Sequence, residues 1–171
     1  MADIKKIGLG GGCHWCTEAV FSSVIGVTKV EQGWIASTHS DSPFSEAVLI
    51  HFDSQKIDLI TLLNIHLHTH SSRSEHSMRY KYRSAIYTFD IAQTNQAHKA
   101  LSQLQSQFKR PLITIVLPYG AFKINVEKYH NYYYQNPDRP FCQNYISGKI
   151  DLLIKQFPAF TRAEVKVLHS A

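Results

Sequence analysis

The sequence predicts an α+β fold, in which helices pack on a mixed central sheet as an α/β sandwich. Two observations carry this prediction. Short apolar segments alternate with a period of two, and they interleave with longer segments of helical period. Size adds a third, since 171 residues with 44% hydrophobic and 18% charged positions suit one compact domain over residues 1–171. The same composition excludes a disordered chain.

The first half of the chain is expected to hold three strands and one helix. Residues 4–9 form a predicted strand, which the glycines at 10–12 end. Apolar spacing over 13–24 predicts a helix with one apolar face, and 27–35 and 46–52 are expected strands. These neighbouring strands favour a mixed sheet that includes hairpin-like pairs.

The second half is expected to continue the alternation. Its elements are a helix at 58–68, a strand at 84–89, a long amphipathic helix at 91–108 and a strand at 112–117. Asp58 is the expected N-cap of the first of these helices, and Pro118 follows the last strand. Beyond them, Tyr129 and Tyr133 share one helical face before a tail punctuated by prolines.

Charge and cysteine usage limit the classes of function. The net charge is +5, and its densest basic spots are only Lys5-Lys6 and Lys109-Arg110, so neither a nucleic acid nor a membrane partner is expected. Three cysteines are too few for a secreted disulfide framework. No stretch reaches the roughly 18 apolar residues of a membrane span, and the N-terminus lacks a signal-peptide core. We therefore expect a cytoplasmic protein.

Cys13 is the strongest candidate for a reactive residue. It follows three glycines at a predicted junction between a strand and a helix. Unpaired amides and the positive end of the helix dipole favour a thiolate over a thiol at such a position. The thiolate is the nucleophilic form of cysteine, so the pattern favours covalent or redox chemistry at Cys13 over a purely structural role.

A dinucleotide-binding turn is an alternative explanation of the same glycines. Gly8 and Gly10 precede the helix, and Glu31 lies about 20 residues on, where an acid would bind a ribose. Cys13 occupies the place of the third glycine, however, and the chain is short for a cofactor domain plus a substrate domain. The pattern therefore disfavours a nicotinamide enzyme.

A second alternative is a metal site at a histidine cluster. His66 and His70 would share one helical face, with His68 between them and His76 nearby. No second cysteine pair and no His-Glu-x-x-His pattern accompanies them. We therefore expect exposed or capping histidines, and neither a metal nor another cofactor.

Four ordered blocks carry a family resemblance. They are GGCHWC at 11–16, EAV at 46–48, KYRSAIY at 81–87 and EKYHNY at 127–132, followed by NP at 136–137 and PFC at 140–142. Together they resemble the motifs of the A-type peptide methionine sulfoxide reductases. The match spans about residues 4–150 and leaves the tail, 151–171, outside it.

The resemblance implies a ferredoxin-like core and a thiol-dependent reduction of methionine-S-sulfoxide, free or in peptides and proteins. Cys13 would attack the sulfoxide sulfur, release methionine and become a sulfenic acid. Glu46 matches the family's acid, and a carboxyl buried near apolar groups could keep a proton to donate to the sulfoxide oxygen. Tyr82 would hydrogen-bond the same oxygen. Such an enzyme repairs proteins after oxidative stress.

The resemblance also implies a resolving thiol and a reductant. A second cysteine condenses with the sulfenic acid, and thioredoxin reduces the resulting disulfide. Cys16 lies three residues beyond Cys13 and suits a local disulfide, whereas Cys142 lies in the tail, whose mobility would bring it to Cys13. Cys16 is favoured slightly, and a relay through both stays open.

Departures from the family lie around the expected substrate site. His14 replaces the usual Phe, which together with Trp15 would form an apolar pocket for the substrate methyl group. Imidazole is polar and titrates near neutrality, so a charged His14 would lower the pKa of Cys13 or narrow the substrate range.

Two further family features are altered. The segment before Glu46 is shortened and lacks a second oxygen-binding tyrosine that we can assign. Ser77 occupies the position of a family aspartate, with Glu75 and His76 as substitutes. These changes keep open an alternative function on the same fold, a cysteine redox sensor or binding module without sulfoxide turnover.

Overall fold

The structure, a computed structural model, describes residues 1–39 and 42–170. Its five-stranded mixed sheet has the order β1, β3, β2, β5, β4, and it closes on itself because β4 also pairs with β1. Strands β4 and β5 run parallel, and the other neighbouring pairs are antiparallel. The strands are β1 (Ile4–Gly10), β2 (Val27–Ser37), β3 (Ser45–Asp53), β4 (Ala85–Thr88) and β5 (Ile115–Ile124).

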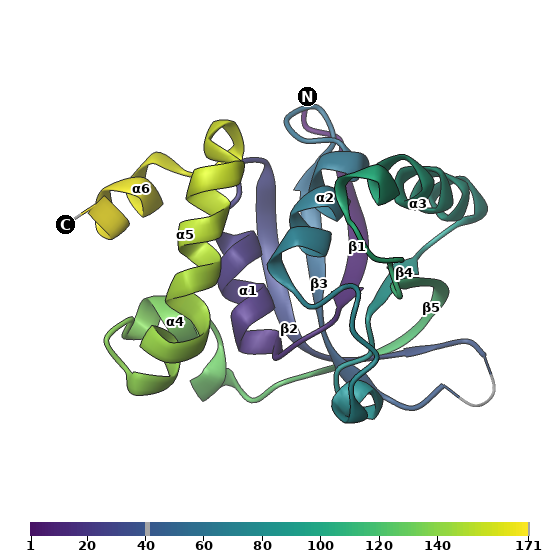
Figure 1. The fold of residues 1–171 in the computed structure, drawn as a ribbon, viewed down its shortest axis with the longest axis horizontal. Helices are drawn as coiled ribbons and strands as arrows, with labels where there is room; N and C mark the ends of the chain where they lie inside the picture. Colours follow the sequence, from purple (N-terminus) through teal and green to yellow (C-terminus); the bar gives the residue numbers. More distant parts are fainter. Residues whose placement is uncertain (40–41, 171) are drawn as a thin grey trace.

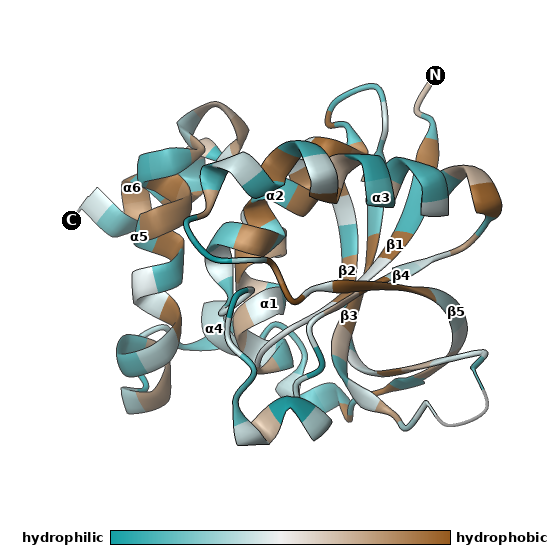
Figure 2. Ribbon diagram, turned by 45° about the vertical axis from the view of Figure 1, so that its right-hand side comes forward, coloured by the Kyte–Doolittle hydropathy of each residue, from teal (hydrophilic) through white to brown (hydrophobic). Residues whose placement is uncertain are grey.

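Helices cover the outer side of this closed sheet (Figures 1 and 2). Helix α1 packs on β1, β2 and β3, helix α3 packs on β4 and β5, and α2 contacts both helices. Helix α5 contacts α1 and α2 on the side that faces away from the sheet. The helices are α1 (His14–Ser22), α2 (Leu59–Thr69), α3 (Ile91–Leu104), α4 (Tyr132–Gln135), α5 (Ser147–Gln156) and α6 (Ala163–Ser170).

The predicted ferredoxin-like core is present. Four strands lie in the order β4, β1, β3, β2, with α1 connecting β1 to β2 and α2 lying between β3 and β4 in the chain. Strand β5 then bridges the two edges of this core by pairing with β2 on one side and β4 on the other. The two edges of the core are therefore both paired, which removes two strand edges open to aggregation.

Alternate residues of the strands build two apolar layers. In β3, Val48 and Ile50 face the layer beneath the helices, whereas Leu49 belongs to a smaller layer with Ile35 and Tyr87 inside the closed sheet. Gly8 of β1 opposes Tyr87, and a Cβ there would lie 2.8 Å from Ile35 Cδ1 and 2.9 Å from Tyr87 Cβ. A glycine at position 8 is therefore required for these two large side chains to fit inside the sheet.

Most predicted elements are confirmed, and their ends differ by a few residues. Asp58 caps α2, as predicted, by accepting a hydrogen bond from Thr61 N at 2.9 Å. The last strand is wrong by several residues, because β5 begins at Ile115 and continues past Pro118. Pro118 is the last residue paired with β4, and antiparallel pairing with β2 begins at Tyr119, so its missing N–H interrupts neither ladder.

The tail punctuated by prolines contains two helices, α5 and α6, that the sequence did not predict. After a short 3-10 turn at Glu127–Tyr129, the chain is mainly helical, and α5 and α6 follow α4. The tyrosine run does not form one helix, because Asn131 between the two turns adopts a left-handed conformation with φ of 56°. None of the helices in the described ranges is long and apolar enough to cross a bilayer.

Candidate functional site

A tight turn after β1 presents Cys13 at the start of α1. Gly11 lies against the ring of His70, and a Cβ at Gly11 would lie 2.3 Å from His70 Cδ2. The Gly11 carbonyl accepts a hydrogen bond of 3.0 Å from Arg79 Nη1. A side chain at this position would push the turn away from α2, so the glycine fixes where Cys13 begins the helix.

The Cys13 thiol lies in an environment that favours the thiolate. Cys13 is the N-cap of α1, and its carbonyl accepts hydrogen bonds of 3.1 Å from the amides of Cys16 and Thr17. A hydrogen bond from the Cys16 thiol and the backbone amides of Trp15 and Cys16 lower the pKa of Cys13, although burial and a negative charge on Glu46 oppose this. Cys13 is half-buried, so its sulfur is shielded but not sealed from solvent.

The other two thiols, Cys16 and Cys142, are more deeply buried than Cys13. Cys16 is buried, and the adjacent Cys13 sulfur, followed by burial, raises its pKa. Its thiol lies 3.9 Å from the carbonyl of Tyr145, which belongs to the helical segment Cys142–Ile146. Cys142 is fully buried in that segment, and burial raises its pKa. The three thiols are free.

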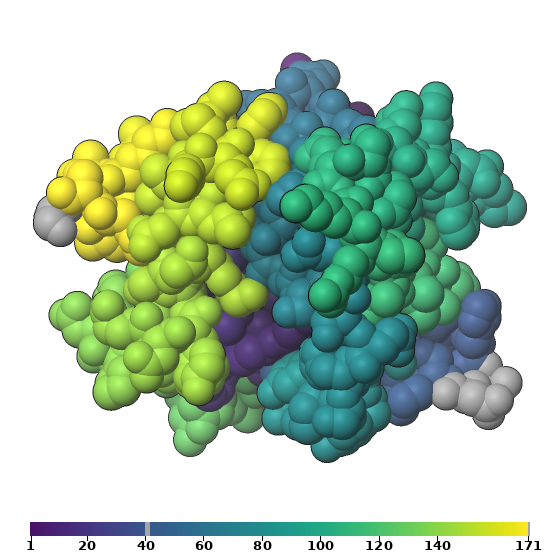
Figure 3. Space-filling view, in the orientation of Figure 1, coloured from purple at the N-terminus to yellow at the C-terminus, as the bar shows by residue number. Residues whose placement is uncertain are grey.

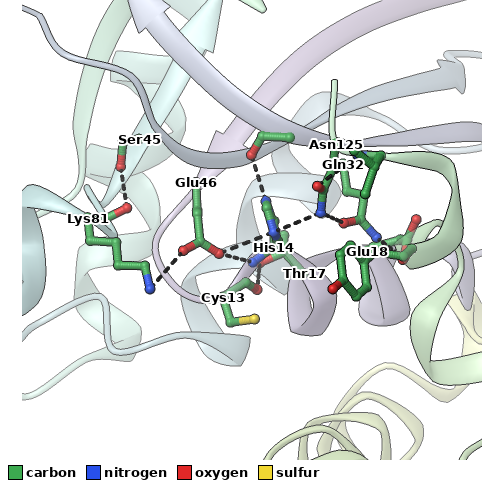
Figure 4. A network of polar contacts seen from close by, with 12 residues as sticks. Cys13, His14, Thr17, Glu18, Gln32, Ser45, Glu46, Lys81 and Asn125 are labelled. Atoms are coloured by element: carbon green, nitrogen blue, oxygen red, sulfur yellow. Dashed lines mark hydrogen bonds and ion pairs between the residues drawn. The ribbon is translucent and has the colours of Figure 1, made fainter. Parts of the chain in front are cut away.

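Glu46 points from β3 towards the first turn of α1 (Figure 4). Its side chain is buried, which corrects the ordinary expectation of a carboxylate on an open strand face. One carboxyl oxygen, Oε1, lies 3.3 Å from the backbone amide of His14 and 3.4 Å from its ring Nε2. The other oxygen lies 3.6 Å from Lys81 Nζ.

The ring of His14 is turned into the protein. It is 4% exposed, and its Nδ1 lies 2.7 Å from the carbonyl oxygen of Gly33. The side-chain amide of Asn125 approaches Nε2 at 3.5 Å, and the indole of Trp34 meets the ring edge-on. Burial is the main cause that lowers the pKa of His14. The ring is therefore part of a buried polar network and not an open apolar wall.

Trp15, in contrast, belongs to an aromatic group beside Cys13. Its half-buried indole stacks on Tyr132 with ring centres 4.1 Å apart, and Phe141 and Tyr129 lie at 5.4 and 5.2 Å. Trp15 Nε1 is buried and finds no hydrogen-bond partner within the described residues. An aromatic surface of this kind suits an apolar group such as a thioether methyl.

Tyr82 lies in the loop before β4, half-buried and next to Lys81. Lys81 Nζ is 5.1 Å from the centre of the Tyr82 ring, and Tyr82 and Glu46 raise the pKa of Lys81. Lys81 thus links the two side chains that the sequence analysis selected. Lys81 was not predicted as a site residue, although it begins the KYRSAIY block.

A buried hydrogen-bond network around Glu18, which the sequence did not predict, supports the site. Glu18 is buried in α1 and accepts hydrogen bonds from the amide of Asn131, the amide of Tyr132 and Nε2 of Gln32, at 3.0, 3.3 and 2.8 Å. Gln32 in turn accepts from Asn125 at 2.9 Å. Burial raises the pKa of Glu18. The network connects the turn that carries Tyr132 to the His14 ring.

The expectation of exposed or capping histidines holds for His76, which is exposed and caps Ser77–Tyr80, and for His70, the C-cap of α2, but it is wrong for the buried His66. His66 and His70 are buried and stack with ring centres 4.1 Å apart, and His70 Nε2 lies 2.8 Å from the Ser84 hydroxyl. His68 is half-buried, with its Nδ1 2.9 Å from the Asn64 carbonyl. No cluster of three or more metal-binding side chains occurs over residues 1–39 and 42–170.

The replaced family positions lie at the edge of the site. Ser77 begins the 3-10 helix Ser77–Tyr80 and is exposed, as are Glu75 and His76. Positions 40 and 41, in the shortened segment before Glu46, lie outside the described residues. Figure 3 shows the purple N-terminal segment at the floor of a hollow, between the yellow-green segment that leads into α5 and the teal segment that precedes β4.

Comparison with known proteins adds family evidence. A family model described as "Peptide methionine sulfoxide reductase" matches residues 5–160. The peptide methionine sulfoxide reductase MsrA of Trichodesmium erythraeum is 33% identical over 172 aligned positions, which cover 91% of this chain and 97% of that protein.

Solved structures share the fold. Mxr1 of Saccharomyces cerevisiae in its reduced form superposes with a TM-score of 0.69 at 22% identity, covering 85% of this chain and 94% of that chain. Mxr1 in complex with Trx2 superposes with a TM-score of 0.59 at 17% identity, covering 77% of this chain and 88% of that chain. Both likenesses agree with the predicted α+β class.

Proposed function

The chain belongs to the peptide methionine sulfoxide reductase family, and on that premise we propose that it reduces methionine-S-sulfoxide, free or in peptides and proteins, to methionine. One observation carries the proposal: a half-buried Cys13 with a lowered pKa begins a helix beside the buried carboxyl group of Glu46. A nucleophile and a proton source are the two groups that the reaction needs, and both border one site. We place the reaction in the cytoplasm, where thiols are kept reduced.

In the first step, the Cys13 thiolate attacks the sulfoxide sulfur and Glu46 gives its proton to the sulfoxide oxygen. The attack forms a bond between the two sulfurs. This bond and the sulfur–oxygen bond of the substrate then break, the hydroxyl moves to the Cys13 sulfur as a sulfenic acid, and methionine leaves. The substrate is reduced by two electrons and Cys13 is oxidised by two. Tyr82 is the second hydrogen-bond donor proposed for the oxygen, supported by its position beside Lys81 and Glu46.

Substrate binding is assigned to the aromatic group around Trp15. Its stacking on Tyr132 leaves an apolar surface next to Cys13, where the methyl group of the substrate would lie. The family's second apolar wall is replaced by His14, whose buried ring makes polar contacts instead. We therefore propose that Trp15 dominates the methyl pocket and that His14 borders it.

Resolution is assigned to Cys16. Cys16 lies in the first turn of α1 beside Cys13, and its thiol is the main influence that lowers the pKa of Cys13, which supports a Cys13–Cys16 disulfide. Attack on the sulfenic acid forms this disulfide and releases water, which takes the hydroxyl of Cys13 and the proton of the Cys16 thiol. Cys142 lies near enough to Cys16 to raise its pKa and would extend the pathway as a relay.

Thioredoxin is the proposed reductant. It would reopen the disulfide by thiol exchange and return the cysteines to their thiol forms. Support comes from the yeast relative of similar fold, which has been solved in complex with Trx2.

The test is dithiothreitol-driven reduction of dabsyl-methionine-S-sulfoxide beside its R epimer, with Cys13→Ser as the variant. We expect turnover of the S epimer alone, reduced more than about a thousandfold in Cys13→Ser because the nucleophile is lost. Circular dichroism confirms that both proteins are folded. No turnover of either epimer by a folded protein, together with rapid sulfenic acid formation by peroxide, would instead support the redox-sensor function.

A further inference from the structure

Two buried titratable side chains, His14 and Glu46, face each other beside Cys13. His14 is 4% exposed and Glu46 is 5% exposed. The ring Nε2 lies 3.4 Å from Glu46 Oε1, and the same oxygen lies 3.3 Å from the backbone amide of His14. Neither group can reach bulk water without a rearrangement, so each is the other's nearest site for a proton.

The position of the proton on the ring is fixed by Gly33. Its carbonyl oxygen only accepts hydrogen bonds and lies 2.7 Å from His14 Nδ1, so Nδ1 carries a hydrogen. Nε2 therefore offers a lone pair in the neutral ring and a hydrogen in the charged ring. The Asn125 amide donates one of its two hydrogens to Gln32 at 2.9 Å and offers the other to Nε2 at 3.5 Å, so it competes with Glu46 for Nε2 when the ring is neutral.

The two charged neighbours of the pair act in opposite directions, because the Lys81 ammonium favours loss of the shared proton and a Cys13 thiolate favours keeping it. Two titratable groups face the pair: Lys81, whose Nζ lies 3.6 Å from Glu46 Oε2, and the Cys13 thiol. The neutral neighbours are the Gly33 carbonyl and the side chains of Gln32, Trp34 and Asn125. Loss of the shared proton would leave a carboxylate near the Cys13 thiolate, which raises the energy of both. Gain of a second proton would leave an unbalanced cation in a buried site.

We propose that His14 and Glu46 hold one proton between them, and that His14 is a positioning residue that keeps this proton available for transfer from Glu46 to the sulfoxide oxygen. The inference rests on the proposed function. When the ring holds the shared proton, Nε2 passes it to Glu46 Oε1, and Glu46 gives that same proton to the sulfoxide oxygen. The transfer leaves a neutral His14 ring and a Glu46 carboxylate. When the reductant reopens the disulfide, Cys13 returns as a thiol, and its proton moves back to the pair as the thiolate forms.

The pair predicts a measurable change in the pH dependence of activity. Two sites in contact hold their last common proton more tightly than either site alone. The alkaline limb of kcat/KM, where this proton is lost, should therefore lie at higher pH in the wild type than in His14→Gln, which cannot accept a proton. We expect a shift of about one pH unit, the size that defines strongly interacting sites.

Trp34→Phe is the matched control, because it alters the packing on the His14 ring without removing a titratable group. It should leave the alkaline limb in place even if its rate changes. An alkaline limb at the same pH in the wild type and in His14→Gln would overturn the proposal.

A second readout needs no turnover. Nitrogen-15 NMR of the reduced protein follows His14 Nε2 as the pH changes, in the wild type and in Glu46→Gln. A shared proton predicts that the His14 transition moves to lower pH in Glu46→Gln, because the carboxyl partner is gone. An unchanged transition would overturn the pair. A moved transition in a protein that reduces no sulfoxide would keep the pair and refute the proposed function instead.

Discussion

Buried histidines lie on two sides of the turn that carries Cys13, a single one on the β3 side and a stacked pair on the α2 side. They differ in the charge that lies next to the ring. On the β3 side, Nε2 of His14 meets the carboxyl group of Glu46 at 3.4 Å. On the α2 side, His66 and His70 stack on each other, and the charges that act on them are the cations Lys149 and Arg79. Residue type and burial are the same in the two groups, whereas the sign of the neighbouring charge is opposite.

This difference decides which ring can carry a proton. Burial lowers the pKa of all three histidines, but Glu46 offsets part of that effect at His14. Burial and the nearby cations lower the pKa of His66 to about 3, so it stays neutral at physiological pH. His14 therefore belongs to the chemistry of the site, and the stacked pair belongs to the support of the Gly11 turn.

Removing the acid is expected to have the largest effect. Glu46→Gln keeps the size of the side chain and removes the proton donor, so kcat/KM for methionine-S-sulfoxide should fall by about 10²–10⁴-fold. Steady-state kinetics with dithiothreitol measure this. Glu18→Gln is the matched control, a buried carboxyl of α1 whose partners are backbone amides and Gln32. It should lower stability with a much smaller loss of rate, and equal rate losses would refute the role of Glu46.

The next effect concerns stability in acid. The pKa of His66 is lower in the folded than in the unfolded chain, so the unfolded state binds the extra proton between about pH 6.5 and 3. The stability that depends on a neutral His66 is complete above about pH 6.5 and is lost as the pH falls below it. One proton contributes about 1.4 kcal/mol per pH unit to this slope.

His66→Gln should remove that part of the slope, as measured by urea unfolding at several pH values between about 7 and 4.5. Ile65→Val, on the same helix and also fully buried, is the control. It should lower the free energy of unfolding by about 1 kcal/mol at every pH and leave the slope unchanged. A His66→Gln slope equal to that of the wild type would show that His66 does not bind a proton on unfolding.

The smallest effect is expected at the turn itself. Gly11→Ala brings a methyl group within 2.3 Å of the His70 ring, so the ring or the turn must shift at a cost of about 1–3 kcal/mol. A Cβ at Gly12 meets nothing within 4 Å, which makes Gly12→Ala the control. Thermal unfolding compares the two variants, and equal stability would contradict the close packing of Gly11 on His70.

Much of the fold was predictable because local sequence and global pairing agree. Alternation in β3 and the Asp58 cap each specify an element on their own. Pro118 misled the strand prediction because its effect depends on which partner strand needs the N–H, and pairing is not visible along the sequence. The helices of the tail were not predicted because they are stabilised by packing on α1 and α2 rather than by strong local signals.

The candidate site was also predictable only in part. Cys13 follows from the glycine turn and the helix start, both local features. Its polar surroundings do not, because Lys81, Gln32 and Asn125 approach from strands and loops far apart in the sequence. Likewise, the sequence alone left His14 as a replaced pocket wall, and only the tertiary structure brings it to Glu46.

The most direct test of the account mixes fully reduced protein with methionine-S-sulfoxide in the absence of any reductant and maps the thiols by mass spectrometry. The account predicts methionine release, loss of two free thiols and a disulfide between Cys13 and Cys16. In Cys16→Ser, Cys13 should be trapped as a sulfenic acid that dimedone labels. Methionine release with Cys13 still a free thiol in Cys16→Ser would contradict the account.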